Sequence, residues 1–210
     1  MRLIFATGNE GKMREIRAIM ADVCPQILSL KEAGLKAEAE ENGASFAENA
    51  QIKAMEIHDK LKAEAQKAGR PLDALVLADD SGLCIDALEG APGILSARWM
   101  GHDASYEEKN RVLIEKLADV PEAQRGAQFV CSICAVLPGG QVLHTEGVMP
   151  GKIAHAPAGA GGFGYDPIFY LPEYGMTSAE LSAEEKNRIS HRGLALSRMK
   201  ERLISEGIFA

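Results

Sequence analysis

Two adjacent aspartates, Asp79 and Asp80, stand in the stretch LADDSG, directly after the apolar run Leu75 to Ala78. The run predicts a buried strand that ends at the aspartates, and strand ends often present functional side chains. Neighbouring carboxylates repel each other unless one is protonated or a cation lies between them. The pair therefore indicates a divalent metal site or a general base. The alternative is a polar turn in which one aspartate caps the next segment.

A second candidate is the stretch TGNEGK, residues 7 to 12, which follows an apolar run and precedes a helical pattern. It is not a Walker loop, because Gly8 and Gly11 are three residues apart rather than five and Lys12 is followed by Met13. The stretch nevertheless places backbone N–H groups, a hydroxyl, an amide and an ammonium beside a helix N-terminus, which suits an anion. A plain strand-to-helix turn with a solvated lysine is the alternative.

The acidic stretch EAEENG supplies Glu38, Glu40 and Glu41. Glutamates in such a run are usually solvated, so on its own this stretch is more typical of a surface loop than of a metal site. It bears on metal binding only if folding brings it close to Asp80.

A capping-box pattern, Ser45 with Glu48, follows the acidic stretch and predicts a long helix that runs to Lys67. Asn49 and Lys53 are four residues apart, so we expect them to share a face near the start of this helix.

The stretch AGAGGFGYD has four glycines within the six residues from Gly159 to Gly164. Glycines permit a close approach of the backbone to a ligand, and an aromatic side chain such as Phe163 or Tyr165 can stack on a flat base. A flexible loop with core aromatics is the alternative, but the unusual composition favours a binding loop.

The stretch EEKNRISHRG adds Lys186, His191 and Arg192. Separately, the histidine is compatible with a core position and the arginine with a surface position. Together, the three side chains would form a donor-rich wall suited to a carbonyl oxygen or a phosphate.

Composition limits the class of protein. The chain has 210 residues, of which 46% are apolar and 25% charged, the balance of an ordinary globular protein. Its formal net charge of −7 disfavours binding to a DNA or RNA backbone but allows a nucleotide pocket, which needs only a few local cations. No stretch approaches about 18 apolar residues, so we expect no membrane span. Met1 leads directly into the first predicted strand, so we expect a cytoplasmic location.

Cys131 and Cys134 form a C-x-x-C, a spacing that can indicate metal or redox chemistry. They lie in the strand-like run AQFVCSICAVL, where residues three apart point to opposite faces. The chain has no second C-x-x-C. We therefore predict two thiols within a strand rather than a metal or redox site.

The remaining pattern mixes strands with helices without strict alternation. We predict strands at residues 3–6, 27–30, 127–137, 141–149 and near 168–170, and helices at 12–20, at about 105–117 and after SHRG. This mixture predicts an α/β or α+β fold around a central mixed sheet. We expect the hairpin of two long strands to form a lobe of its own, with an active-site cleft between two lobes.

The chain resembles the inosine triphosphate pyrophosphatase family in six stretches that follow one another in the family's order. These are TGNEGK, EENGASFAENAQIKA, LADDSGL, LEGAPGILSARW, AGAGGFGYDPIF and EEKNRISHRG. The resemblance runs from Leu3 to beyond Arg192, nearly the whole chain. It implies a single two-lobed α/β domain, a homodimer and Mg²⁺ as cofactor. The implied reaction is hydrolysis of non-standard purine nucleoside triphosphates (ITP, dITP, XTP) to the monophosphate and pyrophosphate.

The resemblance also implies a role for each matching residue. Asp80 would accept a proton from the attacking water and would bind the metal together with Glu40, although the motif leaves open whether Glu40 or Glu41 faces the metal. Trp99 stands where a smaller aromatic residue is usual. The first six residues of the following list would hold phosphates, and Phe163 would stack on the base. The implied substrate-binding residues are Thr7, Gly8, Asn9, Glu10, Gly11, Lys12, Lys53, Ser81, Phe163, Gly164, Tyr165, Asp166, Lys186, His191 and Arg192.

Hydrogen bonding would then select the base. Hypoxanthine and xanthine have a 6-oxo acceptor where adenine has an amino donor, so donors at His191 and Arg192 would favour the first two. Two rival functions stay open: a hydrolase that releases the γ-phosphate or prefers other nucleotides, and a nucleotide-binding regulator without catalysis. The retained carboxylates and lysines disfavour the regulator.

Overall fold

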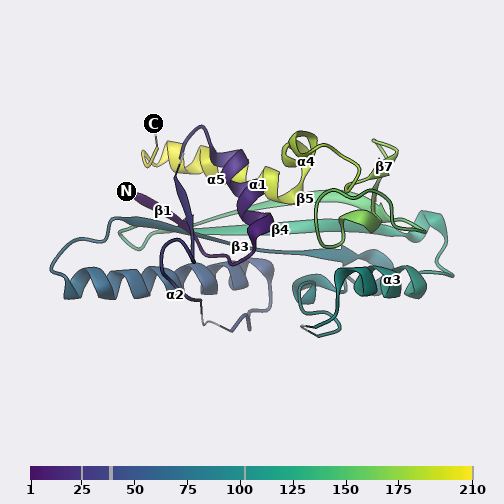
Figure 1. Cartoon of the computed structure of the whole chain (residues 1–210), viewed down its shortest axis with the longest axis horizontal. Helices are drawn as coiled ribbons and strands as arrows, with labels where there is room; N and C mark the ends of the chain where they lie inside the picture. The colour runs from purple at the N-terminus through teal and green to yellow at the C-terminus, as the bar shows by residue number, and fades with distance from the viewer. Residues whose placement is uncertain (25, 38–39, 102, 210) are drawn as a thin grey trace. The chain divides into compact units, whose positions relative to one another are not determined.

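The computed structural model describes residues 1–24, 26–37, 40–101 and 103–209. Within these residues, seven strands form one sheet in the order β2-β1-β3-β4-β5-β6-β7 (Figure 1). The strands are β1 (Arg2–Phe5), β2 (Ile27–Ser29), β3 (Ala74–Ile85), β4 (Gly126–Val136), β5 (Val142–Ile153), β6 (Phe169–Leu171) and β7 (Met176–Thr177). The helices are α1 (Glu10–Met20), α2 (Phe46–Lys67), α3 (Tyr106–Lys116), α4 (Ala183–Ile189) and α5 (His191–Ser205). Short 3-10 turns lie at η1 (Asp86–Leu88), η2 (Gly93–Leu95), η3 (Glu122–Gln124) and η4 (Asp166–Ile168).

The sheet is mixed, as the sequence predicted. Strand β1 pairs in parallel with both β2 and β3, so that Phe5 lies opposite Ser29 on one side and Leu77 on the other. At the other end of the order, β6 pairs antiparallel with β5 and with β7. This combination of parallel and antiparallel pairs with covering helices confirms the predicted α/β fold.

The chain divides into two compact units. Unit 1 contains residues 1–80, 131–147 and 192–210, and unit 2 contains residues 81–130 and 148–191. Strands β3, β4 and β5 each contribute residues to both units. The expectation that the β4–β5 hairpin forms a lobe of its own is therefore wrong: each of its long strands is shared between the units.

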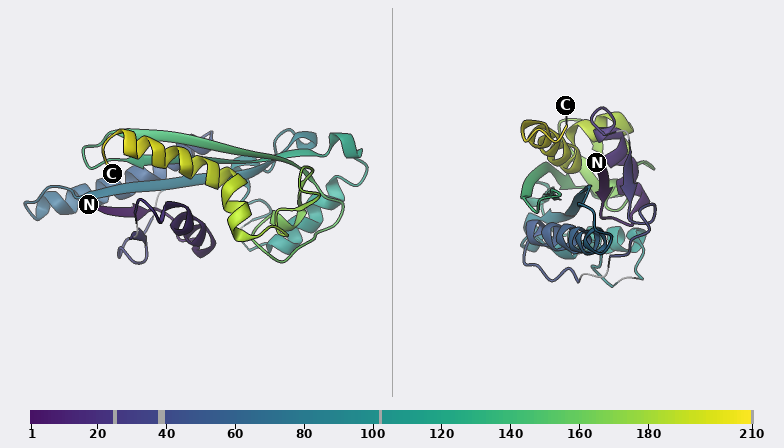
Figure 2. Two further views of the ribbon diagram at one scale, coloured as in Figure 1. Left: turned by 90° about the horizontal axis from the view of Figure 1, so that it is seen from above. Right: turned by 90° about the vertical axis from the view of Figure 1, so that its left-hand side faces the viewer.

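Unit 1 has a core on each face of its part of the sheet. On one face, Leu75 and Leu77 pack with residues of α1 and α5, including Ile16 and Leu196. On the other face, β3 packs against α2 through residues such as Val76. Helices α1 and α5 therefore cover one face and α2 covers the other (Figure 2). This layering follows from strand geometry, because successive side chains of β3 point to opposite faces.

Unit 2 has its own core, in which Leu83 and Ile85 of β3 pack with Leu113 of α3 and with Phe129 and Phe169. The two phenylalanine rings lie with their centroids 4.4 Å apart.

Arg125 is the largest fully buried side chain of the described residues, and it donates to three backbone carbonyl oxygens of unit 2. These bonds satisfy a charged group that would otherwise be costly to bury.

Local sequence signals explain where the helices begin. Ser45 Oγ accepts a hydrogen bond from the Glu48 backbone N–H at 3.2 Å, which caps α2 as predicted. Glu48 does not complete the box, because its carboxylate accepts from the Ala44 N–H at 2.7 Å instead. A complete capping box, Ser182 with Glu185, opens α4, a helix that the sequence analysis did not predict.

Cys131 and Cys134 both lie in β4 and point to opposite faces, as predicted. Cys131 lies in the core shared with α1 and α5, whereas Cys134 lies in the core shared with α2. Burial raises the pKa of both thiols to about 12, so both are held in the neutral, unreactive form.

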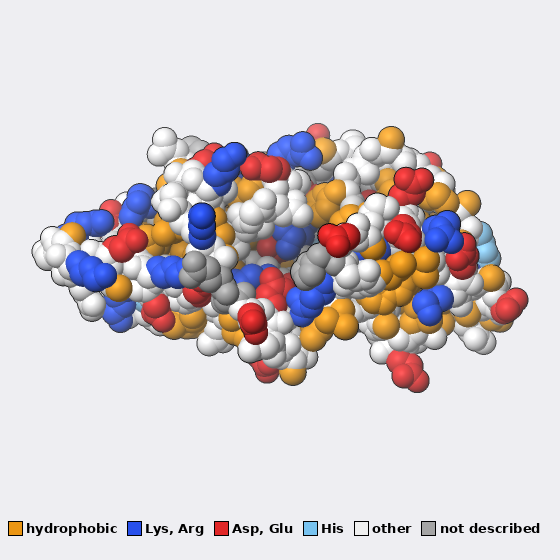
Figure 3. Space-filling model, turned by 60° about the horizontal axis from the view of Figure 1, so that its bottom comes forward, with side chains coloured by type: hydrophobic (Ala, Val, Ile, Leu, Met, Phe, Trp, Pro, Cys, Tyr) orange, Lys and Arg blue, Asp and Glu red, His pale blue; other side chains and the backbone are white. Residues whose placement is uncertain are grey.

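None of the described helices is long and apolar enough to cross a membrane. On the face shown in Figure 3, lysine and arginine side chains are interspersed with aspartates and glutamates. The described side chains of this face do not form the continuous basic surface that a nucleic acid backbone requires.

Candidate active site

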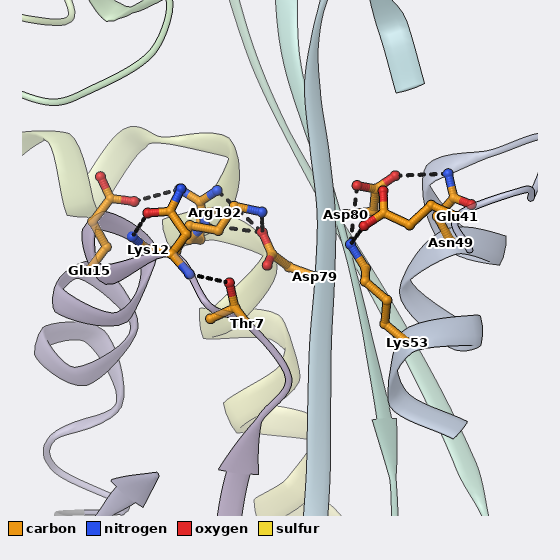
Figure 4. A network of polar contacts seen from close by, with 10 residues as sticks. Thr7, Lys12, Glu15, Glu41, Asn49, Lys53, Asp79, Asp80 and Arg192 are labelled. Carbon is orange, nitrogen blue, oxygen red and sulfur yellow. Dashed lines mark hydrogen bonds and ion pairs between the residues drawn. The ribbon is translucent and has the colours of Figure 1, made fainter. Parts of the chain in front are cut away.

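Strand β3 does not end at the aspartates, and this is the main correction to the sequence analysis. It continues through DDSG to Ile85, so the alternation of the strand sends Asp79 and Asp80 to opposite faces of the sheet (Figure 4). The two carboxylates therefore do not share one cation, as the expected pair would. Asp79 faces α1 and α5, whereas Asp80 faces α2.

Asp79 lies in a buried network of charges. Its Oδ2 atom is 2.9 Å from Lys12 Nζ and accepts from Arg192 Nε and Nη2 at 3.4 and 3.3 Å. The remaining Arg192 nitrogen, Nη1, donates to Glu15 Oε2 at 2.5 Å. Burial opposes ionisation of Asp79, but the neighbouring charges, Lys12 first, hold its pKa well below the usual range of a carboxyl. Asp79 is therefore an anion that two cations hold in place.

The turn before α1 has the construction of an anion site. Asn9 caps the helix by accepting from the Lys12 N–H at 3.1 Å, and Thr7 Oγ1 accepts from the Asn9 N–H at 3.2 Å. A Cβ added at Gly8 would meet no atom within 4 Å, and residues 8 to 10 are exposed. The turn can therefore be approached from outside, next to a helix N-terminus and a lysine.

Asp80 lies in a different environment on the α2 face. Its Oδ1 is 3.4 Å from Lys53 Nζ, and its Oδ2 accepts from Asn49 Nδ2 at 3.2 Å. The same lysine is 3.1 Å from Glu41 Oε1. Burial raises the pKa of Asp80, the Lys53 charge offsets only part of this effect, and the Glu41 charge adds to it. Burial alone would lower the pKa of Lys53, but the charge of Asp80 and of the other nearby carboxylates raises it above its usual value.

The acidic stretch contributes Glu41 to this cluster. Glu40, which we expected to be the metal ligand, is exposed, and its backbone oxygen accepts from the Asn42 N–H at 2.9 Å. Glu38 lies outside the described residues. Because Glu41 shares Lys53 with Asp80, the structure favours Glu41 over Glu40 as the acid beside the candidate base.

The α2-face cluster fits a divalent cation. Within the described residues no group of three or more His, Cys, Asp and Glu side chains is arranged to hold a metal on its own. Mg²⁺, however, is commonly bound by one or two protein carboxylates together with waters and substrate phosphates. Asp80 and Glu41 supply two carboxylates around the single ammonium of Lys53, so these three side chains carry one net negative charge when all are ionised.

In unit 2, Asp166 is the centre of another network. Its Oδ2 accepts from the Phe163 N–H at 2.7 Å and from Lys186 Nζ at 2.6 Å, and its Oδ1 accepts from Ser178 Oγ at 2.8 Å. Lys186 Nζ also lies 4.9 Å from the centroid of the Phe163 ring. The glycine at 162, with φ of +69°, is required here, since its Cβ would lie 2.2 Å from Asp166 Oδ2. Asp166 thus holds the predicted stacking residue and the predicted cation together.

Helix α3 fixes the rest of the glycine-rich segment. Asn110 Nδ2 donates to the Gly164 carbonyl at 3.1 Å, and the Tyr106 and Tyr165 rings meet edge to face with centroids 5.2 Å apart. Tyr165 OH donates to the backbone oxygen of Ser96 at 2.8 Å. Gly164 and Tyr165 are therefore anchored by their own unit.

The three side chains of the predicted donor wall each have partners of their own. His191 stacks on Phe129 with centroids 4.8 Å apart in unit 2, whereas Arg192 belongs to unit 1 and binds Asp79 and Glu15. Ser81 follows Asp80 in β3 as the first residue of unit 2.

Some neighbours of the candidate residues were not predicted. Glu15 lies three residues after Lys12, a spacing that places both on one face of α1, so the sequence did contain this signal. Ser178 and Asn110 had no comparable signal, because their partners are distant in the chain. Asn49 was placed correctly beside Lys53, but its bond to Asp80 was not foreseen.

Comparison with known proteins adds independent evidence. The model of the Ham1 family matches residues 3–202. A dITP/XTP pyrophosphatase of Yersinia pseudotuberculosis is 48% identical over 206 residues, covering 96% of this chain and 98% of that protein. A dITP/XTP pyrophosphatase of Clostridium perfringens is 44% identical over 202 residues, covering 96% of this chain and 97% of that protein.

Solved structures match the fold over nearly the full length. A HAM1 protein from Coxiella burnetii is 37% identical with a TM-score of 0.81, covering 98% of this chain and 99% of that one. The Staphylococcus aureus Ham1 protein is also 37% identical, with a TM-score of 0.80, covering 98% and 100% of the two chains.

Proposed function

The chain belongs to the Ham1 family, and from this premise we propose that it hydrolyses the non-standard purine nucleoside triphosphates ITP, dITP and XTP. The products are the nucleoside monophosphate and pyrophosphate. The observation that carries the proposal is the cluster around Asp80, a buried carboxylate with a raised pKa beside Lys53 and Glu41. Relatives that are 48% and 44% identical over 96% of this chain are dITP/XTP pyrophosphatases.

In this proposal Asp80 is the general base. It takes a proton from the water that attacks the α-phosphorus, while the bond from that phosphorus to the bridging oxygen breaks and pyrophosphate leaves. A carboxyl whose pKa is raised above its ordinary value is a stronger proton acceptor than an exposed aspartate. Lys53 stabilises the ionised form of Asp80 at 3.4 Å and keeps the carboxylate oriented.

Positive charge is needed because phosphoryl transfer depends on neutralising the phosphate oxygens. The turn from Thr7 to Lys12 and the N-terminus of α1 would bind phosphates, with Lys53 as a second cation. Asp80 and Glu41 would hold Mg²⁺, which when bound would neutralise further phosphate charge. In place of Glu40, Glu41 is the acid that the ion pair with Lys53 supports for this role.

Residues of unit 2 would contact the base. Phe163 offers a ring for stacking, and Asp166 holds the ring's backbone and Lys186 together. Donors toward a 6-oxo group would favour hypoxanthine and xanthine over adenine, because an adenine amino group would leave a buried donor without an acceptor. His191 stays a candidate for such a donor. The ion pairs of Arg192 with Asp79 and Glu15 instead support a role in holding α1, whose N-terminus would bind the phosphates.

The test is a product analysis by anion exchange. The purified protein is incubated with ITP, dITP, XTP, GTP and ATP in the presence of Mg²⁺, and the same assay is run on Asp80→Asn. The control is Asp73→Asn, which changes a 66% exposed aspartate just before β3. We expect IMP, dIMP and XMP with pyrophosphate from the wild type and the control, and a large loss of product in Asp80→Asn.

The rival functions give different products. Release of orthophosphate would show that water attacks the γ-phosphorus rather than the α-phosphorus. Equal turnover of ATP and ITP would show that the enzyme does not select the base. Binding without turnover would favour a regulator. A homodimer is a further part of the proposal, and light scattering of the purified protein tests it by its mass.

A further inference from the structure

Asn49 is fully buried on the first turns of α2, and both ends of its side-chain amide are used. Its Oδ1 accepts from the Gly43 N–H at 2.9 Å, and its Nδ2 donates to Asp80 Oδ2 at 3.2 Å. The orientation of the amide follows from chemistry, because a backbone N–H can only donate and an ionised carboxylate can only accept. Asn49 is therefore a link between the candidate base and the segment that contains Glu41.

We infer that Asn49 is a positioning residue of the active site, acting on Asp80 and on the acidic segment at once. The inference rests on the proposed function, in which Asp80 is the base and Glu41 its acidic neighbour. Asn49 occupies Asp80 Oδ2, so that Oδ1 is the oxygen that faces Lys53. Through Gly43 it also fixes the backbone two residues after Glu41.

The close approach of Gly43 supports this role. A Cβ at residue 43 would lie 2.8 Å from Asn49 Oδ1 and 2.8 Å from Glu48 Cβ, a separation that real Cβ atoms do not adopt. The segment is also tied to α2 by the bond from the Ala44 N–H to the Glu48 carboxylate. Loss of Asn49 would therefore free Gly43 and Asp80 while a second tie keeps the segment on the helix.

Two substitutions separate the two bonds. Asn49→Asp keeps an acceptor for the Gly43 N–H but replaces the donor to Asp80 by an oxygen. Asn49→Leu has a similar shape and loses both bonds. The control is Gln51→Leu, which removes an exposed amide from the same helix. The Gln51 amide is bonded to His144 of β5.

The experiment combines kinetics on ITP with amide hydrogen exchange at Gly43. Removing a residue that orients a ligand or base typically costs about 10- to 100-fold in activity, so we expect kcat to fall by that factor in both Asn49 variants, with KM changed less. Exchange at Gly43 should be roughly 2- to 10-fold faster in Asn49→Leu, as for the loss of one hydrogen bond, and unchanged in Asn49→Asp. Gln51→Leu should match the wild type in both measurements.

The outcomes are distinct. If Asn49→Asp folds and keeps kcat within about twofold of the wild type, the positioning role is overturned, since second-shell losses are larger than this. Should Asn49→Leu fail to fold, Asn49→Asp still decides the kinetic question, because it keeps the Gly43 bond. If the wild type forms no pyrophosphate, the proposed function fails. Gly43 exchange in Asn49→Leu and the ¹³C shift of the Asp80 carboxyl in Asn49→Asp then judge the link alone, and wild-type values of both would overturn it.

Discussion

Asp79 and Asp80 are neighbours in the chain and share one strand, yet their surroundings differ in charge balance. On the α1 and α5 face, Asp79 and Glu15 are matched by Lys12 and Arg192, two carboxylates for two cations. On the α2 face, Asp80 and Glu41 share the single ammonium of Lys53. The pKa of Asp79 is lowered and that of Asp80 is raised, in keeping with this difference.

The comparison shows how one strand can combine a structural ion network with a reactive carboxylate. A neutralised buried network holds its groups in place and gains nothing from a further cation. A cluster with excess negative charge is strained by repulsion until a proton or a cation arrives. We therefore expect substitutions on the α2 face to change turnover, and substitutions on the α1 and α5 face to change stability first.

The largest expected effect is that of Asp80→Asn. Removing a general base typically costs about 10²- to 10⁴-fold, so we expect kcat on ITP to fall by that factor. The folded state should not become less stable, since the ionised carboxylate it loses is disfavoured by burial. Steady-state kinetics and urea unfolding of the same preparation measure both effects. Near-normal turnover would show that Asp80 is not the general base and that the α2 face is not the reactive one.

Asp79→Asn should show the opposite balance. It leaves Lys12 and Arg192 with one carboxylate instead of two, and removal of one partner from a buried ion network costs about 3–5 kcal/mol. We expect a loss of unfolding free energy of this size, with a smaller fall in kcat that follows from the displaced lysine. Urea unfolding compared with Asp73→Asn, an exposed aspartate next to the same strand, measures the loss. If stability is unchanged while turnover disappears, Asp79 is catalytic and the assignment of the two faces is reversed.

Substitution of the two lysines sharpens the comparison further. Lys53→Met leaves Asp80 and Glu41 facing each other without their common cation, so we expect a fall of kcat of about 10- to 100-fold. Lys12→Met leaves Asp79 its bonds to Arg192, and of the two kinetic constants we expect KM to change more than kcat, through weaker phosphate binding. Initial rates over a range of ITP concentrations separate kcat from KM. Equal effects of both variants on both constants would contradict a division of labour between the faces.

The sequence predicted elements better than it predicted partners. The cap at Ser45 and the opposite facing of Cys131 and Cys134 were predicted from the sequence, because each depends on spacing within one segment. The sequence predicted a strand that ends at the aspartates, whereas the same alternation holds for Asp79 and Asp80. Strand β3 continues there because each carboxylate finds a cation on its own face.

Partners distant in the chain could not be predicted from spacing. The Asn49 amide meets Asp80 across 31 positions, and the Asp166 carboxylate meets Lys186 across 20. Such bonds depend on the packing of whole elements, so only the family resemblance pointed to some of these residues. It supplied the candidate roles but not the geometry, such as the ion pairs of Arg192 with Asp79 and Glu15.

The smallest effect we predict is in the pH dependence of stability. Asp79 has a lowered pKa, so its contribution is fully present above the usual carboxyl pKa and is lost only when the pH falls through its folded value. Asp80 has a raised pKa, so the folded state binds the proton more tightly and stability declines as the pH rises through the window above the usual carboxyl pKa.

Unfolding free energies measured between about pH 4 and pH 8 can separate the two contributions, because this interval begins near the ordinary carboxyl pKa. Relative to Asp80→Asn, the wild type should lose stability as the pH rises through the lower part of the interval. Relative to Asp79→Asn, its advantage should stay constant across the interval and shrink only in more acidic solution. If the wild type instead gains stability relative to Asp80→Asn as the pH rises, the pKa of Asp80 is lowered in the folded state, like that of Asp79. The two faces of β3 would then not differ in the way that the proposed chemistry requires.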